Sequence, residues 1–226
     1  ELGGLDRVLA ACRRVGAELL VDAYHQINVV PFSLADDGLS DAFVMGGGYK
    51  YCQLGEGNCF LRVPTGRAHL RPVVTGWFSE FAHLSGRAAG AVPYGDGPAR
   101  WAGSTYDPTS HYRAARVLDF FEREELTPSF LRELSRHQVG LLAGRFDALD
   151  LDSRLITRDR SVPLERVGGF LALESPQAGE ISARLRARGV FTDHRADVLR
   201  LGPAPYLSQG QLEAAVAALG EVVRRG

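Results

Sequence analysis

The chain almost lacks lysine: Lys50 is the only one among its 26 lysine and arginine residues. Cysteine is also scarce. Cys12, Cys52 and Cys59 form an odd set without CxxC spacing, which predicts neither a disulfide framework nor a zinc site and fits a reducing cytoplasm. No apolar run approaches the length of a membrane span, and no signal peptide is visible, so we expect a cytoplasmic protein without a membrane partner.

The chain also lacks an excess of charge of either sign. The formal net charge of the 226 residues is −1, with 45% hydrophobic and 23% charged residues, as in an ordinary globular protein. No basic stripe stands out, which argues against a nucleic acid as the main partner. The length allows one large core or two modest domains.

The first half of the chain is typical of the α/β class. Short apolar segments, with a helical segment before them, predict buried strands in a mostly parallel sheet. A glycine- and proline-rich segment, residues 84–109, then predicts a long irregular crossing. We expect a helix over 5–16 and strands over 18–21, 43–45 and 59–63.

The second half predicts a small α+β domain, with the division between residues 1–108 and 109–226. Thr127 followed by Pro128 marks the start of a long helix, and Ser208 caps the last one. The expected helices run from 109 to about 124, from 128 onward, over 176–188 and over 208–223, and the expected strands cover 169–173, 190–192 and 198–201.

Lys50 carries the one side-chain amine of this arginine-rich chain. A guanidinium does not readily lose its proton, whereas a desolvated ammonium does, and the amine then attacks a carbonyl to form a Schiff base. Lys50 directly follows the run Gly46-Gly47-Gly48-Tyr49, and such glycines let a backbone crowd a ligand or adopt positive φ. The context therefore favours a nucleophilic lysine.

Asp22 follows an earlier apolar segment, and the carboxyl ends of parallel strands are where α/β sheets bind ligands. A strand ending in aspartate and another ending at lysine is an arrangement with which many pyridoxal phosphate (PLP) enzymes hold their cofactor. The lysine bonds to PLP, and the acid pairs with its pyridinium nitrogen. PLP is therefore the predicted cofactor, and no metal site is expected.

Several segments together resemble the kynureninases, in the aminotransferase class V group of fold-type I PLP enzymes. The resemblance implies the carboxyl-terminal part of a large PLP domain followed by a small α+β domain. It also implies hydrolysis of a carbon–carbon bond of kynurenine, or of a related β-substituted amino acid, in tryptophan catabolism. The segments are Val21-Asp22-Ala23-Tyr24-His25, Gly48-Tyr49-Lys50-Tyr51, Gly55-Glu56-Gly57, Gly76-Trp77-Phe78, Gly103-Ser104-Thr105 and 189–205.

The resemblance implies a role for each matching residue around the cofactor. Asp22 would pair with the pyridine nitrogen, and His25 would approach the phenolic oxygen of PLP. Tyr49 would hydrogen-bond the phosphate and serve as a general acid. Lys50 would hold PLP and then act as the base at the substrate Cα.

The resemblance also implies contacts to the phosphate and to the substrate. Trp77 and Thr105 would donate to the phosphate from the neighbouring subunit, which implies a homodimer with shared active sites. Arg200 would grip the α-carboxylate of an amino-acid substrate with its planar pair of donors. Purely structural explanations stay open: surface charge for Lys50 and Arg200, a cap for Asp22, a satisfied turn residue for His25, and packing for Tyr49 and Trp77.

The chain departs from the family pattern in two loops and in length. Residues 26–31 carry an extra residue and bulkier groups, and residues 52–59 bring an acidic residue and two cysteines into a loop that is glycine-rich in the family. The phosphate-cradling Thr or Ser pair and the ring-stacking aromatic residue have no counterpart, so we expect a preceding amino-terminal portion. The alternatives are another class V activity (lyase, cysteine desulfurase or aminotransferase) and a degenerate PLP-fold structural module.

Overall fold

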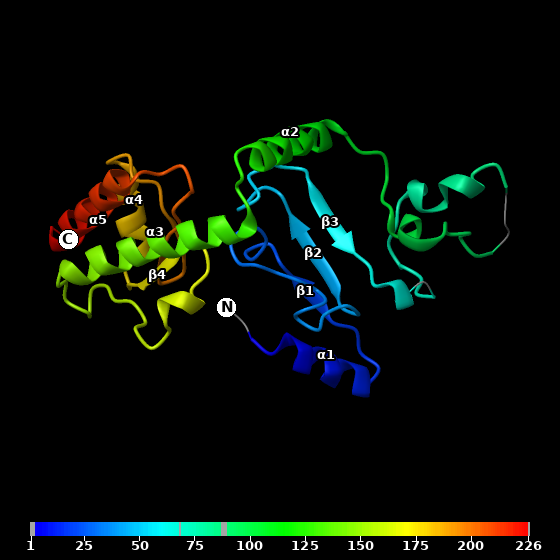
Figure 1. The fold of residues 1–226 in the computed structure, drawn as a ribbon, viewed down its shortest axis with the longest axis horizontal. Helices are drawn as coiled ribbons and strands as arrows, with labels where there is room; N and C mark the ends of the chain where they lie inside the picture. Colours follow the sequence, from blue (N-terminus) through cyan, green and yellow to red (C-terminus); the bar gives the residue numbers. More distant parts are fainter. Residues whose placement is uncertain (1–2, 68, 87–89, 226) are drawn as a thin grey trace. The chain divides into compact units, whose positions relative to one another are not determined.

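The structure, a computed structural model, describes residues 3–67, 69–86 and 90–225. It confirms the α/β class and the small α+β carboxyl-terminal domain (Figure 1). Residues 87–89 of the predicted irregular crossing lie outside the described residues. Within the described ranges, no helix is both long and apolar enough to cross a membrane.

Two compact units make up the fold. The amino-terminal unit contains Leu2–Tyr24 and Phe32–Phe120, and the carboxyl-terminal unit contains His25–Pro31 and Phe121–Gly226. Most of helix α2 (Thr109–Arg123) therefore groups with the amino-terminal unit.

A three-stranded mixed sheet organises the amino-terminal unit. Strand β1 (Leu20–Asp22) runs parallel to the central strand β2 (Phe43–Gly47), and β3 (Cys59–Arg62) runs antiparallel to β2. The direction of each strand follows from its connection. A long crossover joins β1 to β2 and permits parallel pairing, whereas the shorter loop after β2 returns the chain as a hairpin.

Local signals fix the flanking segments of this unit. Helix α1 (Leu5–Arg14) ends at the predicted glycine, because Gly16 adopts a φ of +70° and the Ala17 N–H bonds to the Cys12 carbonyl at 2.9 Å. In the described part of the crossing, the one helical segment is the short 3₁₀ helix η3 (Gly97–Trp101). It is preceded by the 3₁₀ helix η2 (Trp77–His83).

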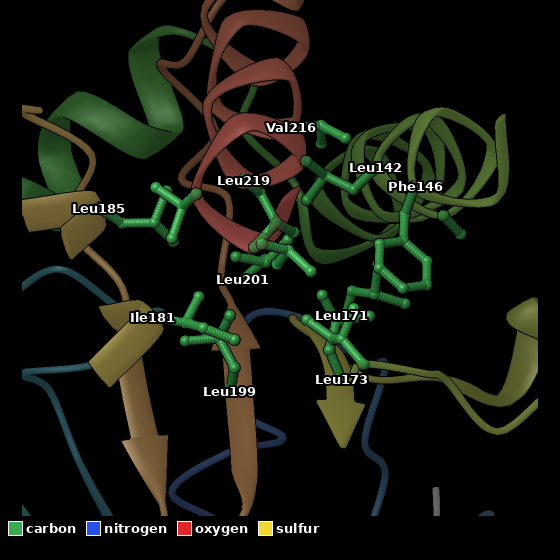
Figure 2. Packing of buried hydrophobic residues seen from close by; sticks show 14 of the residues in the cluster. Leu142, Phe146, Leu171, Leu173, Ile181, Leu185, Leu199, Leu201, Val216 and Leu219 are labelled. Carbon is green, nitrogen blue, oxygen red and sulfur yellow. The ribbon is translucent and has the colours of Figure 1, made fainter. Parts of the chain in front are cut away.

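Antiparallel strands in the order β4-β6-β5 and three packed helices form the carboxyl-terminal unit. Alternate strand residues are buried, so Leu171, Leu199 and Leu201 point toward Leu219 and Phe146 of the helices (Figure 2). The elements are α3 (Pro128–Ala148), β4 (Leu171–Glu174), α4 (Ala178–Arg186), β5 (Asp193–Arg195), β6 (Val198–Leu201) and α5 (Gln209–Arg224).

The predicted helix starts of this unit are confirmed by their caps. The Thr127 hydroxyl accepts the Phe130 N–H, and Ser208 forms a reciprocal capping box with Gln211. The strand predicted over 190–192 is wrong, because the Val190 N–H is used to close α4 on the Leu185 carbonyl at 3.0 Å. The strand begins only at Asp193.

A network of charged side chains stabilises the segment between α3 and β4. Asp147 accepts two bonds from Arg158, at 2.9 and 2.6 Å, and one from Arg160 at 3.0 Å. The bonds from Arg158 lower the pKa of Asp147, although partial burial opposes the shift. The stabilisation is therefore fully present above the ordinary aspartate pKa and is lost as the pH falls through the lowered value.

Asp147→Asn is accordingly expected to lower the free energy of unfolding by about 1–2 kcal/mol near pH 7. Urea titrations at falling pH should show the difference from the parent protein shrinking as Asp147 itself becomes protonated. Asp152→Asn is the matched control, because Asp152 pairs with Arg154, whose side chain is 87% exposed. An equal loss in both variants would contradict a special contribution of Asp147.

Candidate functional site

The candidate site begins at the carboxyl ends of β1 and β2. Asp22 is the last residue of β1 and lies opposite Met45 in the parallel register. Because both strands point the same way, Asp22 and the turn that follows β2 meet at the same edge of the sheet. The Asp22 carboxylate accepts the Tyr24 N–H at 3.0 Å and is otherwise exposed, so it keeps acceptor capacity for a cation.

Lys50 lies in that turn, half-buried, with two tyrosine rings beside its amine. Its Nζ is 5.8 Å from the centroid of the Tyr24 ring and 5.5 Å from that of Tyr49. The two rings are 5.7 Å apart and tilted by 54°. Both distances lie within the range of a cation–π attraction, so the rings form a partly apolar setting around the amine.

The glycines before Lys50 allow close approach, as the sequence predicts, but the groups that approach are side chains of this chain. A Cβ on Gly47 would lie 2.3 Å from Tyr24 Cε1, and one on Gly48 would lie 2.5 Å from Leu54 Cβ. Leu54 is buried, and its N–H bonds to the Gly48 carbonyl at 2.8 Å. The loop after Lys50 therefore folds back tightly on the end of β2.

Tyr24 is the residue that the sequence prediction missed. Hydrogen bonding to the Cys59 side chain, followed by burial and the nearby groups of Cys59, Tyr49 and Asp22, raises the pKa of Tyr24 to about 12. Asp22, Tyr49 and Lys50 are thus brought together around Tyr24. No spacing rule indicates this, because the tyrosine follows β1 whereas the cysteine begins β3.

Trp77 and Thr105, both in the amino-terminal unit, form a pair. The Trp77 Nε1 donates to the Thr105 Oγ1 at 3.2 Å. The backbones are also close, since the Phe78 N–H bonds to the Gly103 carbonyl at 3.1 Å. A Cβ on Gly76 would lie 2.2 Å from the Gly103 carbonyl carbon, so Gly76 is required here. The two predicted phosphate donors thus lie side by side.

Arg200 and His25 belong to the carboxyl-terminal unit. Arg200 lies on the face of β6 opposite the core, where it pairs with Asp193, and its side chain is 18% exposed. Its Cζ is 5.3 Å from the centroid of the Phe170 ring. The His25 ring meets the same phenylalanine at 6.3 Å. Phe170 and Asp193 received no separate role from the sequence.

No group of three or more His, Cys, Asp or Glu residues suited to a metal ion occurs in the described ranges. The cysteines are free thiols. Burial raises the pKa of the Cys52 thiol, whereas Cys59 is exposed. The groups that the structure brings together near Lys50 include an amine, a carboxylate and phenols.

A family model, the kynureninase C-terminal domain, matches residues 131–219. The matched range lies within the carboxyl-terminal unit and includes Phe170, Asp193 and Arg200. No curated protein matches the chain in sequence.

Solved structures similar to this chain include three proteins with different printed activities. A cysteine desulfurase from Thermococcus onnurineus NA1 has a TM-score of 0.75 at 14% identity, over 98% of this chain and 56% of its own. The cystine C-S lyase C-DES has a TM-score of 0.78 at 15% identity, over 96% of this chain and 56% of its own. A ureidoglycine–glyoxylate aminotransferase from Bacillus subtilis has a TM-score of 0.69 at 18% identity, over 99% of this chain and 57% of its own.

The chain spans little more than half the length of these solved structures, and nearly all of it is matched by each of them. At such low identity, the likeness establishes the fold alone. The chain therefore has the fold of the carboxyl-terminal part of fold-type I PLP-dependent enzymes.

Proposed function

We propose that this chain is part of a PLP-dependent hydrolase that cleaves a carbon–carbon bond of kynurenine or of a related β-substituted amino acid. The observation that carries the proposal is the placement of Lys50 just after β2, at the same edge of the sheet as Asp22, the last residue of the parallel strand β1. The match of residues 131–219 to the kynureninase C-terminal domain supports this choice of reaction among those of the fold.

The side chains present fit PLP in their chemistry. Lys50 offers an amine and Asp22 a carboxylate with acceptor capacity. In the Trp77–Thr105 pair the single indole N–H is already donated to Thr105, so the Thr105 hydroxyl is the donor left for a phosphate. When bound, PLP withdraws the electron pair that is left at Cα after a bond to that carbon breaks. The space beside Gly47 and Gly48 is filled by the side chains of Tyr24 and Leu54. We therefore assign these glycines to the packing around Lys50 and not to contact with a ligand.

The chain's own residues would divide the work as follows. Lys50 would hold the cofactor and would also move the proton at the substrate Cα, because a neutral amine is a base. Asp22 keeps the pyridine nitrogen protonated, and His25 approaches the phenolic oxygen of PLP. Tyr49 contacts the phosphate and donates a proton during cleavage. Arg200 binds the substrate carboxylate through its two parallel donors.

A desulfurase is disfavoured by the state of the thiols. Sulfur transfer requires a mobile, nucleophilic cysteine, and nucleophilicity depends on the thiolate form. The pKa of Cys52 is raised by burial, and Cys59 is the first residue of strand β3 rather than part of a mobile loop. The free state of Cys12, Cys52 and Cys59 supports placement in a reducing cytoplasm.

Substrate assays on the full-length protein supplied with PLP test the reaction. We expect kynurenine to yield alanine and an aromatic acid, with no sulfide from cysteine and no transfer of an amino group to glyoxylate. Chromatography of the products distinguishes these reactions. Sulfide release or amino transfer, without cleavage of kynurenine, would assign the chain to another class V activity. Binding of PLP without any turnover would support the structural module.

We further propose a homodimer in which Trp77 and Thr105 contact the phosphate bound by the partner subunit. Mixing inactive Lys50→Ala protein with an inactive Trp77→Ala/Thr105→Ala double variant should restore some activity, because one site of each hybrid dimer then has all its intact residues. The restored activity is measured after hybrid dimers are confirmed by mass. Hybrid dimers without activity would mean that each subunit builds its site alone.

A further inference from the structure

We propose that Tyr24 is a positioning residue for Lys50: its ring fixes where the lysine amine lies at the end of β2. This inference rests on the proposed binding of PLP at Lys50. Attachment requires the neutral amine to reach the aldehyde carbon of PLP, forming a carbon–nitrogen double bond and releasing one water molecule. A long, flexible lysine side chain reaches one position reliably only if its surroundings restrict it.

The Tyr24 ring itself is held from two sides. The ring packs so closely on Gly47 that a Cβ there would lie 2.3 Å from Cε1 and 2.8 Å from the hydroxyl oxygen. The Cys59 side chain, on strand β3, is the largest cause of the raised pKa of Tyr24, which agrees with a hydroxyl that faces this strand. The backbone N–H of Tyr24 is bonded to Asp22 at 3.0 Å. These contacts leave the ring little freedom to rotate.

The Lys50 amine lies against this fixed ring. Nζ is 5.8 Å from the Tyr24 centroid and 5.5 Å from that of Tyr49. Tyr49 is exposed and adjacent to Lys50 in sequence, so its ring moves with the same turn. Tyr24 lies two residues after the end of β1, far from Lys50 in sequence, and its ring packs on Gly47 of β2. The ring therefore positions the amine, and the contact with Gly47 positions the ring.

The experiment measures how fast PLP becomes attached to Lys50 in the full-length protein, by borohydride quenching at timed intervals and mass spectrometry of the Lys50 peptide. Tyr24→Leu should slow attachment by about tenfold, because the ring that restricts the position of the lysine side chain is lost. Tyr24→Phe keeps the ring and should restore the rate to within about threefold of the parent. Tyr112→Leu, at a tyrosine that is 74% exposed on α2, is the matched control and should have no effect.

Gly47→Ala gives a second route that keeps both tyrosines in the chain, because the added Cβ displaces the Tyr24 ring without removing it. It should slow attachment as Tyr24→Leu does, and circular dichroism identifies any variant that has not folded. Parent-like rates in both Tyr24→Leu and Gly47→Ala would overturn the inference, as would equal slowing in Tyr24→Leu and Tyr24→Phe. Failure of the parent protein to attach PLP at Lys50 would instead overturn the proposed function.

Discussion

Lys50→Arg is expected to abolish covalent attachment of PLP while leaving the fold intact. Arginine keeps the positive charge beside the rings of Tyr24 and Tyr49, so the local packing changes little. It cannot supply a neutral amine, so the carbonyl carbon of PLP has no nucleophile to react with. The yellow absorbance of the bound cofactor and all turnover should disappear, while the circular dichroism spectrum and the melting temperature stay those of the parent protein.

A second lysine placed elsewhere provides the control. Arg116→Lys puts an amine at a side chain that is 88% exposed on α2. Combined with Lys50→Arg, it restores one lysine to the chain but should not restore the absorbance, because an exposed amine lacks the surroundings of Lys50. Retention of colour and activity in Lys50→Arg would contradict the assignment of Lys50.

Arg200→Leu is expected to raise KM for amino-acid substrates about 30-fold or more, with little change in PLP content. Loss of one partner from a desolvated charge pair costs on the order of 2–5 kcal/mol, because the carboxylate is left unpaired. The side chain of Arg200 is mostly buried, lies over the Phe170 ring and pairs with Asp193. Its guanidinium group is therefore already oriented. Steady-state kinetics, with PLP content measured by absorbance, tests the expectation.

Arg186 provides the matched control for this variant. It is also an arginine over a phenylalanine, with its Cζ 5.1 Å from the centroid of the Phe191 ring, but it lies in α4. Arg186→Leu should leave KM unchanged. If Arg200→Leu keeps the parental KM, or if both variants raise it equally, Arg200 has a structural role only.

The sequence predicts well the features that depend on neighbours along the chain. The caps at Thr127 and Ser208 and the glycine end of α1 all rest on backbone groups within a few residues. The positions of Asp22 and Lys50 at one edge follow from strand ends, which apolar runs indicate. Local chemistry therefore accounts for most of the elements and for the core of the candidate site.

Features that depend on contacts between distant segments escape such prediction. The Tyr24 ring, which follows β1, packs on Gly47 of β2. The guanidinium of Arg200 lies over the ring of Phe170, which is 30 positions earlier in the chain. The start of β5 is set by a helix cap that uses Val190. Only the fold brings these groups together, and composition or periodicity gives no sign of it.

Identification of the residue that holds PLP is the most direct test of the central claim. The full-length protein should be incubated with PLP, reduced with borohydride and digested, and the modified peptide sequenced by mass spectrometry. We predict the mass of reduced PLP on Lys50, at about one equivalent per chain. Modification at any other residue, or none at Lys50 under conditions that saturate the protein with PLP, would contradict the claim.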